Sequence, residues 1–407
     1  MLTREPVHLM KAESKNRGPA TSRGKGEQHF LWLLSPPWDG VQTRQQHFAR
    51  RLARSGMKVL YVENPPAWSS VLRQRNWRGA SFFNQYEREI EPGLHVLRPA
   101  VSIPGTMRSD AIAALNGRLL ARQLNKWFYL HDWTDYLAWC RVPACIFALK
   151  HLQPHRIAYD ITDDYELYAR HPGERERTAA RETAMLRRAD LVFVTAEELL
   201  RKPALQPANP FLLSNGVDYN LFAQAGEPGA IAPLLLGLKR PIVGYVGLTS
   251  HWMDFELLRK LAQRWPGQIV MVGPIQAQVE AQAKSIPGIV WAGFVPQPEL
   301  PPYLRGMDVL IMPHKVNELR TRSNPLKTWE CLATGKPFVT VDLPALNPAR
   351  HLLHVAQNHD QFLELVTGCV KYDPPAAKLA RQALATHYSW DALLEQLISN
   401  LLPAPCA

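Results

Sequence analysis

The sequence has few cysteines and lacks long hydrophobic runs. Its 407 residues include only five cysteines, and these show no paired spacing of the kind that metal ligands have. That pattern argues against structural zinc and favours a reducing compartment. No apolar run reaches the roughly 18–20 residues that a bilayer-spanning helix needs, and none of secretory type opens the chain. We therefore expect a cytoplasmic protein.

Acidic residues are outnumbered by basic ones, 36 to 47, which gives a net charge of +11. Part of the excess lies in residues 1–27, a polar stretch that we predict to be a disordered basic tail. No helix-turn-helix, zinc or aromatic-interleaved basic motif indicates nucleic acid. An anionic membrane surface fits the charge better, and a basic surface without a partner is the alternative. The other basic residues behind this expectation form two clusters, Arg44, Arg50, Arg51, Arg54 and Arg181, Arg187, Arg188.

The length and the order of apolar runs predict two α/β domains. A chain of 407 residues is too long for one typical core. Near its start, a continuous apolar run at 30–34, a loop, a helix at about 43–55 and a strand at 58–62 form the opening of a doubly wound sheet. The loop carries Gly40 and Val41 at the carboxyl end of a strand, where such sheets bind ligands. It lacks the three-glycine fingerprint of NAD-binding proteins.

A second strand–helix alternation begins at residue 242 and continues to residue 312. We therefore predict a first domain at 28–222, a linker at 223–240 and a second domain at 241–387. A further helical pattern covers residues 388–402.

The sequence contains start and stop signals for one short helix. Asn324 is a strong N-cap, Pro325 suits the first helical position, and Gly335 suits the left-handed residue that ends a helix. The free N–H groups at its start and Lys327 in its first turn form an anion site, and Glu330 lies on the same face. The alternative is an ordinary capped helix with a surface Lys–Glu pair.

Several polar residues follow other predicted strands. His314 follows the strand at 308–312, and Arg320 and Arg322 flank the same helix start, where arginine suits bidentate phosphate binding. Asp163 and Asp164 follow the strand at 156–161, where they would bind substrate hydroxyls, cap a helix or hold a metal.

His131 ends a predicted strand at 127–130, and we expect it to contact a reacting phosphate or hydroxyl, with a structural role as the alternative. No Gly-x-Ser-x-Gly elbow supports acyl transfer.

Together these motifs resemble a GT-B glycosyltransferase, similar to the retaining enzymes of bacterial surface polysaccharide synthesis. The resemblance covers about residues 29–402 and depends on the order of five motifs: Tyr159–Asp164, Ala189–Thr195, Ser214–Asp218 with its Asn-Gly-Val-Asp sequence, Asn324–Pro337 and Tyr388–Trp390. It implies two Rossmann-like domains that face a central cleft, with the helix at 388–402 returning to the first domain.

The resemblance also implies roles for the site residues. Glu330 would bind the donor ribose, and Lys327 with the helix start at Asn324, Pro325 and Leu326 would bind the diphosphate. The Gly40–Val41 loop would close over the donor, His131 would lie near the donor sugar, and no metal would be needed. His131, Asp163 and Lys327 are the predicted catalytic residues. The predicted substrate-binding residues are Gly40, Val41, Asp164, Asn215, His314, Arg320, Arg322, Asn324, Pro325, Leu326 and Glu330.

Two departures from the family pattern affect the mechanism. Many retaining members carry paired glutamates eight positions apart, but the partner position of Glu330 is Arg322. Many also carry an Arg and a Lys after the first strand of the second domain, and residues 247–254 contain neither. The diphosphate charge is then expected to be met by Arg320, Arg322 and Lys327, and the stereochemistry is left open.

The sequence therefore predicts a metal-independent transferase of the hexosyltransferase type. It would move a sugar from a UDP- or GDP-linked donor, with no other cofactor, to a glycan or a lipid-linked acceptor at the inner face of the plasma membrane. The alternatives are a nucleotide-sugar epimerase on the same scaffold and a non-catalytic binding protein.

Overall fold

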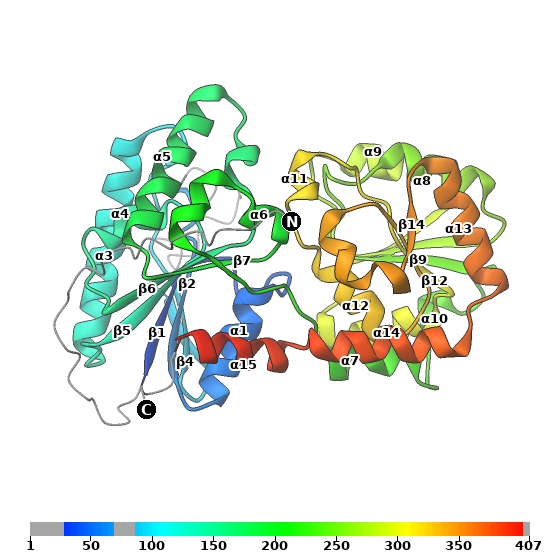
Figure 1. Cartoon of the computed structure of the whole chain (residues 1–407), viewed down its shortest axis with the longest axis horizontal. Coiled ribbons are helices and arrows are strands. Elements are labelled where there is room, and N and C mark those ends of the chain that lie inside the picture. The colour runs from blue at the N-terminus through cyan, green and yellow to red at the C-terminus, as the bar shows by residue number, and fades with distance from the viewer. Residues whose placement is uncertain (1–27, 69–85, 402–407) are drawn as a thin grey trace, which may run out of the picture.

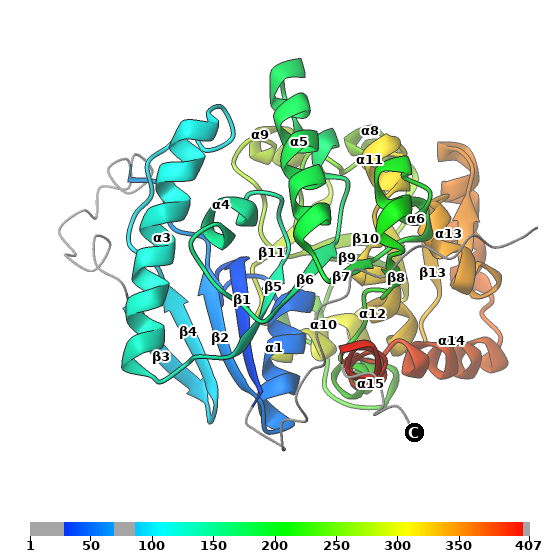
Figure 2. The ribbon, with the colours of Figure 1, turned by 60° about the vertical axis from the view of Figure 1, so that its left-hand side comes forward.

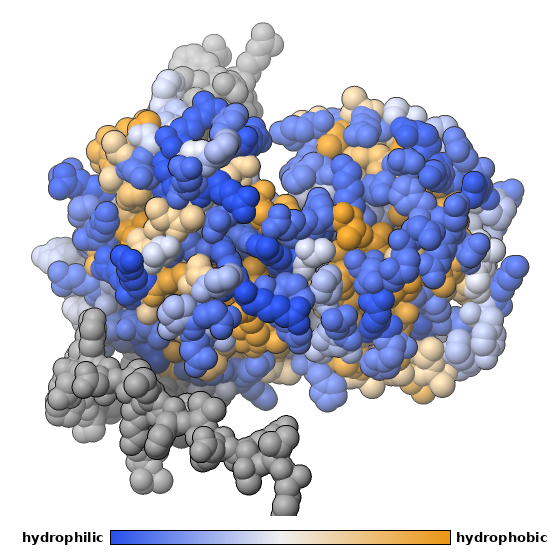
Figure 3. Space-filling model, turned by 45° about the horizontal axis from the view of Figure 1, so that its top comes forward, coloured by the Kyte–Doolittle hydropathy of each residue, from blue (hydrophilic) through white to orange (hydrophobic). Residues whose placement is uncertain are grey.

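The computed structural model describes residues 28–68 and 86–401. The predicted tail at 1–27 lies outside the described residues. Two α/β domains lie side by side, each built on its own sheet (Figure 1). The space-filling view shows the two lobes with a notch between them (Figure 3). The fold class predicted from the sequence, two Rossmann-like domains, is confirmed.

The first domain contains an eight-stranded sheet in the order β3-β4-β2-β1-β5-β6-β7-β8. Only the β3–β4 pair is antiparallel among these described strands. The strand bounds are β1 His29–Ser35, β2 Lys58–Glu63, β3 Tyr86–Glu91, β4 Leu94–Arg98, β5 Tyr136–Cys140, β6 Arg156–Ile161, β7 Leu191–Val194 and β8 Phe211–Leu212.

Helices cover both faces of this sheet, which explains why its central strands are continuous apolar runs. Leu31 and Leu33 of β1 pack into the core under α3, α4 and α5, whereas Phe30 and Trp32 pack on the opposite face against α1 and α15 (Figure 2). The helix bounds are α1 Arg44–Arg54, α3 Asp110–Leu130, α4 Cys145–Leu149, α5 Pro172–Arg188, α6 Glu197–Leu200 and α15 Trp390–Leu401.

The prediction of a strand at 127–130 is wrong, because these residues are the last turn of α3. Leu120, Leu124, Trp127 and Phe128 are buried at helical spacing, so the helical pattern that begins near residue 110 continues through the aromatic residues. The strand that follows is β5, which starts only at Tyr136.

The second domain contains a six-stranded parallel sheet in the order β11-β10-β9-β12-β13-β14. This is the Rossmann order, and the chain reverses its direction of growth between β9 and β12, where such sheets bind ligands. The strand bounds are β9 Ile242–Val246, β10 Gln268–Val272, β11 Ile289–Gly293, β12 Val309–Met312, β13 Phe338–Val341 and β14 His354–Ala356. The helix bounds are α7 Tyr219–Ala223, α8 Phe255–Arg264, α9 Glu280–Lys284, α10 Leu300–Gly306, α11 Glu318–Thr321, α12 Leu326–Thr334, α13 His359–Lys371 and α14 Pro375–His387.

The chain crosses between the domains twice, and the two crossings are hydrogen-bonded to each other. The Val217 N–H donates to the Tyr388 carbonyl at 2.9 Å, and the Trp390 N–H donates to the Val217 carbonyl at 3.0 Å. Gly216 lies in this contact, where a Cβ atom would come within 2.7 Å of the Tyr388 oxygen. After the second crossing, α15 packs against α1 of the first domain (Figure 1).

Candidate active site

A cavity of about 300 Å³ lies between the two domains. On the first domain it is lined by residues that follow β1, β5 and β6, and on the second by residues at the ends of β9 and β12 and at the start of α12. Both sheets therefore present their carboxyl edges to one cleft, as ligand-binding α/β sheets do. The lining includes Arg141, Asp163, Tyr245, His314, Arg320 and Lys327.

Lys327 extends from the first turn of α12 into this cleft. Its Nζ lies 5.6 Å from the centroid of the Tyr245 ring. Its stem runs over Gly247, where an added Cβ atom would lie 1.7 Å from Lys327 Cε, and the Gly247 φ of +145° also favours glycine. The loop after β9 thus has to carry a glycine for the lysine to reach this position.

A narrower pocket of about 70 Å³ continues from Lys327 towards the first domain's loop after β1. Gly40 and Val41 line one side, and Glu330 lines the other, together with residues that follow β9, β10 and β11. Burial raises the pKa of Glu330, while Lys327 and a hydrogen bond from Gln297 lower it. The structure therefore brings together Gly40, Val41, Lys327 and Glu330, which come from two domains.

The buried His314 and the half-buried Arg320 form a pair on the wall of the cleft. Arg320 Nη2 lies 3.1 Å from His314 Nδ1, so Nδ1 accepts and the imidazole is neutral with its proton on Nε2. Burial, then Arg320 and Lys327, hold the pKa of His314 well below its ordinary value. The Nε2 atom is buried without a hydrogen-bond partner in the described structure. Burial also lowers the pKa of Arg320, which lies across the cleft from Asp163.

Asp164 and Arg322 bind each other instead of facing a ligand. Asp164 is only 2% exposed and pairs with Lys202 at 3.0 Å and with Arg322 across the domain boundary. Arg322 also pairs with Glu318 at 2.8 Å. A carboxylate buried to this extent needs such partners. The prediction that Asp164 and Arg322 bind substrate is therefore corrected, because the structure uses them to join the domains.

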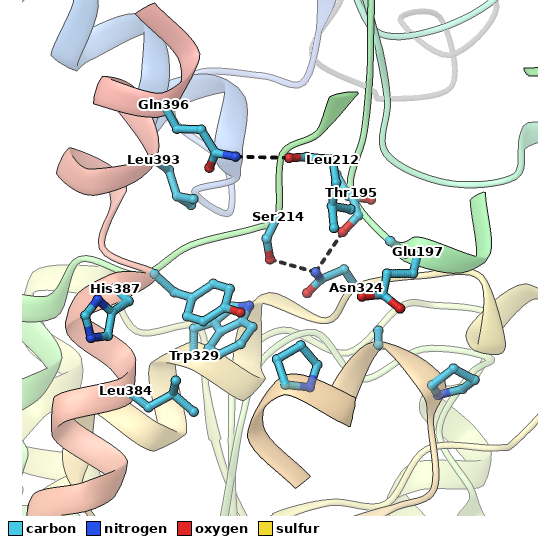
Figure 4. Close-up of a pocket in the computed structure, with 15 residues that line it drawn as sticks. Thr195, Glu197, Leu212, Ser214, Asn324, Trp329, Leu384, His387, Leu393 and Gln396 are labelled. Carbon is cyan, nitrogen blue, oxygen red and sulfur yellow. Dashed lines mark hydrogen bonds between the residues drawn. The ribbon is translucent and has the colours of Figure 1, made fainter. Parts of the chain in front are cut away.

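Asn324 is likewise an interdomain contact and not the N-cap that the sequence predicted. The N-cap position is Pro325, in an extended conformation, and α12 begins at Leu326. The Asn324 amide donates to the Thr195 carbonyl and to Ser214 Oγ of the first domain, both at 2.8 Å (Figure 4). In return, Asn215 Nδ2 donates to the Asn324 carbonyl at 2.6 Å. We call the Asp164–Arg322 pair and these asparagine contacts the interdomain clasp.

Comparison with known proteins finds similar glycosyltransferases. Residues 240–371 match the family described as Glycosyl transferases group 1. The chain is 24% identical over 230 residues to TuaH of Bacillus subtilis (strain 168). That relative is named as a teichuronic acid biosynthesis glycosyltransferase. It is 32% identical over 162 residues to the 2-deoxystreptamine N-acetyl-D-glucosaminyltransferase of Streptomyces fradiae. These matches cover 53% and 35% of this chain, and only 58% and 38% of the relatives.

Solved structures match over nearly the whole chain. Sucrose-phosphate synthase from Thermosynechococcus elongatus superposes with a TM-score of 0.70 at 16% identity, over 92% of this chain and 98% of that one. Anabaena HepE in complex with UDP and glucose gives 0.59 at 15% identity, over 92% and 99%. The chain has the GT-B fold. Its second domain carries the group 1 glycosyltransferase match, and the resemblance stated from the sequence is confirmed.

Within this GT-B fold, the prediction for His131 is wrong. His131 follows the last turn of α3 and precedes the amino end of β5, which is the edge of the sheet opposite to the cleft. Its ring stacks on Trp127 with centroids 3.9 Å apart, and its Nδ1 lies 2.9 Å from the Trp127 carbonyl oxygen. The expected position at a strand end followed from reading 127–130 as a strand.

Sequence reasoning missed Arg141, a cation of the GT-B cleft. It follows β5 directly and lines the cleft beside Asp163. The signal was present, because Tyr136–Cys140 is a fully buried apolar run. The strand predicted at 127–130 hides this signal, because those residues are the end of α3.

Two further facts concern metals and membranes. Within the described ranges, 28–68 and 86–401, no group of three or more His, Cys, Asp or Glu side chains could hold a metal ion. The helices of that same part are all too short or too polar to cross a bilayer.

Proposed function

We propose that this protein transfers a sugar from a nucleotide-sugar donor to a glycan or lipid-linked acceptor in surface polysaccharide synthesis. The observation that carries the proposal is the position of Lys327, in the first turn of α12, and of Arg320, on α11, in the wall of a cavity that the opposite domain also lines. The names of the relatives, TuaH above all, support this function, and HepE was solved with UDP and glucose. None of the relatives reported above is an epimerase, so that alternative has no support.

The proposed donor is UDP- or GDP-linked, and its diphosphate would lie against Lys327 and the free amides at the start of α12. Fixed cations and helix dipoles stabilise the negative charge that develops on the leaving diphosphate. Arg320 adds a second cation, and the buried His314 Nε2–H can donate to a sugar or phosphate oxygen. Glu330 would bind the ribose hydroxyls in the narrow pocket, under Gly40 and Val41. We propose a hexosyltransferase that needs no metal, because Lys327 and Arg320 would supply the positive charge that the leaving diphosphate requires.

The test is calorimetric titration with UDP and GDP. We expect Lys327→Ala to weaken binding of the preferred nucleotide by about tenfold or more, which corresponds to roughly 1.4 kcal/mol. Lys284→Ala is the matched control, because Lys284 is an exposed lysine of α9 in the same domain. Equal affinities in the wild type and in Lys327→Ala would show that the donor site is assigned wrongly. Absence of any nucleotide binding would favour the non-catalytic alternative.

The arginines behind the predicted membrane contact are mostly engaged within the protein. Arg44 is buried against Asp160, Arg50 and Arg54 pair with Glu91, and Arg51 pairs with Asp391. Arg181 pairs with Asp110. Most of these arginines are therefore not free to contact a membrane.

We propose that the outer face of α3 binds an anionic membrane surface instead, at the inner face of the plasma membrane. No acidic residue occurs between residues 111 and 130, and Leu115, Leu119, Tyr129 and Leu130 are exposed. The helix lies at the outer edge of the first domain (Figures 1 and 2). Basic and apolar side chains on one helix face suit an anionic bilayer. The exposed basic residues of this face are Arg118, Arg122 and Lys126.

Vesicle sedimentation tests this contact. We expect the protein to sediment with phosphatidylglycerol vesicles more than with phosphatidylcholine vesicles, and Arg118→Glu with Arg122→Glu to abolish the difference. A control pair on another helix, Arg175→Glu with Arg187→Glu on α5, should retain it. Equal sedimentation of both variant pairs would refute α3 as the membrane contact.

A further inference from the structure

A second cavity, of about 380 Å³, opens in the first domain beside the cleft. It shares three lining residues with the cleft, namely Arg141, Asp163 and Tyr168. Its other walls come from the loop after β5, from the turn that starts at Tyr165 and from α5. A molecule bound here would therefore reach the cleft at Asp163.

The walls of this cavity are mainly apolar. Val142, Pro143 and Ala144 line one side, and Met107 and Tyr165 line others. Pockets for small organic groups have this character, with few polar groups placed to orient the ligand. The ring faces of a sugar carry C–H groups that pack well against tyrosine and aliphatic side chains.

The two arginines of this cavity differ in their partners. Arg181 is buried and pairs with Asp110, and it also donates to the Thr106 carbonyl at 2.8 Å. Among the described residues, by contrast, no carboxylate forms an ion pair with Arg141, whose Nη1 makes only a 3.4 Å hydrogen bond to Tyr165 Oη. Its Nε is buried without a partner in the described structure. Arg141 thus keeps donors for an anion at the junction of the cavity and the cleft.

We infer that this cavity is the acceptor subsite and takes an anionic acceptor. The anionic group would be the carboxylate of an acidic glycoside or the phosphate of a lipid-linked one. The ring or isoprenyl part would lie against Val142, Ala144 and Tyr165, and the anionic group would bind Arg141. A hydroxyl of this ligand would then lie next to Asp163, at the edge of the cleft that holds the donor. The inference rests on the proposed function, because it assigns the second substrate of the same reaction.

Binding measured on protein saturated with UDP or GDP, whichever binds, tests the inference, because the donor cations are then occupied. The probes are methyl glucuronide, methyl glucoside and dimethylallyl phosphate. We expect one acidic probe to bind at least tenfold more tightly than the neutral glucoside, and Arg141→Gln to remove that preference. Preference for the glucuronide indicates an acidic glycan, whereas preference for the phosphate indicates a lipid headgroup. Arg187→Gln, an exposed arginine on α5, is the control that should keep the preference.

A second variant, Ala144→Phe, fills the cavity without touching the donor pocket. We expect it to abolish binding of the acidic probe while nucleotide affinity stays at the wild-type value, which also reports that the variant is folded. A wild type that prefers the neutral probe, or an Arg141→Gln variant that keeps the acidic preference, would overturn the inference alone. A wild type that binds no nucleotide would overturn the proposed function first.

Discussion

At the scale of single residues, the three aspartates at the carboxyl end of β6 differ in their partners. Asp160 is bound at both oxygens by Arg44 at 3.0 Å, and Asp164 is neutralised by Lys202 and Arg322. Asp163, in contrast, forms no ion pair with any described residue. Burial raises its pKa to about 6, although Arg320 and Arg141 oppose the shift. Asp163 is therefore the aspartate that can change its charge near neutral pH.

This difference predicts a pH dependence of transfer. Since the raised pKa means that Asp163 gains its proton as the pH falls through about 6, kcat/KM for the acceptor should fall below that pH by about tenfold per unit. Asp163→Asn should lower the rate at pH 8 by about tenfold or more, as expected when a roughly 1.5 kcal/mol charge-assisted hydrogen bond is lost. It should also remove the inflection, so a pH profile of Asp163→Asn that still bends near pH 6 would contradict this role.

Single residues were predictable where their chemistry depends on near neighbours in the sequence. The sequence predicts that Lys327 and Glu330 lie on the same face, because they are three residues apart in one helix. The sequence does not indicate that Arg322 and Asn324 belong to the interdomain clasp, because their partners, Asp164 and Thr195, are 158 and 129 residues away. No local pattern reports such distant partners.

At the scale of elements, amphipathic spacing and end signals determine what a sequence can predict. Gly335 ends α12 in the left-handed conformation, with φ of 73°, as the sequence indicated. The structure begins α12 one position later than the sequence predicts, at Leu326 and not at Pro325. The reason is that a proline can itself hold the extended N-cap conformation. The sequence analysis assigns residues 127–130 to a strand, although they belong to α3. Four adjacent bulky residues resemble a strand unless the helical spacing is followed back to residue 110.

The packing of α15 gives a prediction about stability. Trp390 is 1% exposed and stacks on His47 of α1 with ring centroids 4.9 Å apart. We expect Trp390→Ala to lower the free energy of unfolding by about 3–5 kcal/mol, because it leaves a cavity between α15 and the first sheet. Chemical denaturation followed by circular dichroism measures the change. Trp68→Ala, at a tryptophan that is 43% exposed, should cost far less, and similar losses in both variants would refute the argument.

At the scale of the whole molecule, the two domains are joined by the two chain crossings and by the interdomain clasp. The crossings are hydrogen-bonded backbone, whereas the clasp consists of side chains that can separate. The two-domain architecture could be predicted because each sheet has its own series of apolar runs. The relative position of the domains could not, because it depends on side chains that meet only after both have folded.

Removing the charged part of the clasp should therefore favour an open arrangement of the domains. Arg322→Gln keeps the Asp164–Lys202 pair but loses the ion pair across the boundary. We expect small-angle scattering of this variant without nucleotide to give a larger radius of gyration than the wild type. Arg350→Gln breaks a pair with Asp342 inside the second domain and should leave the radius unchanged. An unchanged radius in Arg322→Gln would mean that the clasp does not hold the domains together.

The position of α15 has a consequence for biosynthesis. Leu393, Leu397 and Leu401 complete the apolar layer on Phe30 and Trp32, which are translated more than 350 residues earlier. While the ribosome is still making the second domain, α1 can cover part of that side, but the part under α15 remains exposed to solvent and to chaperones. Its final packing must wait until the segment at 390–401 has left the exit tunnel, so the lobe that is made first is completed last.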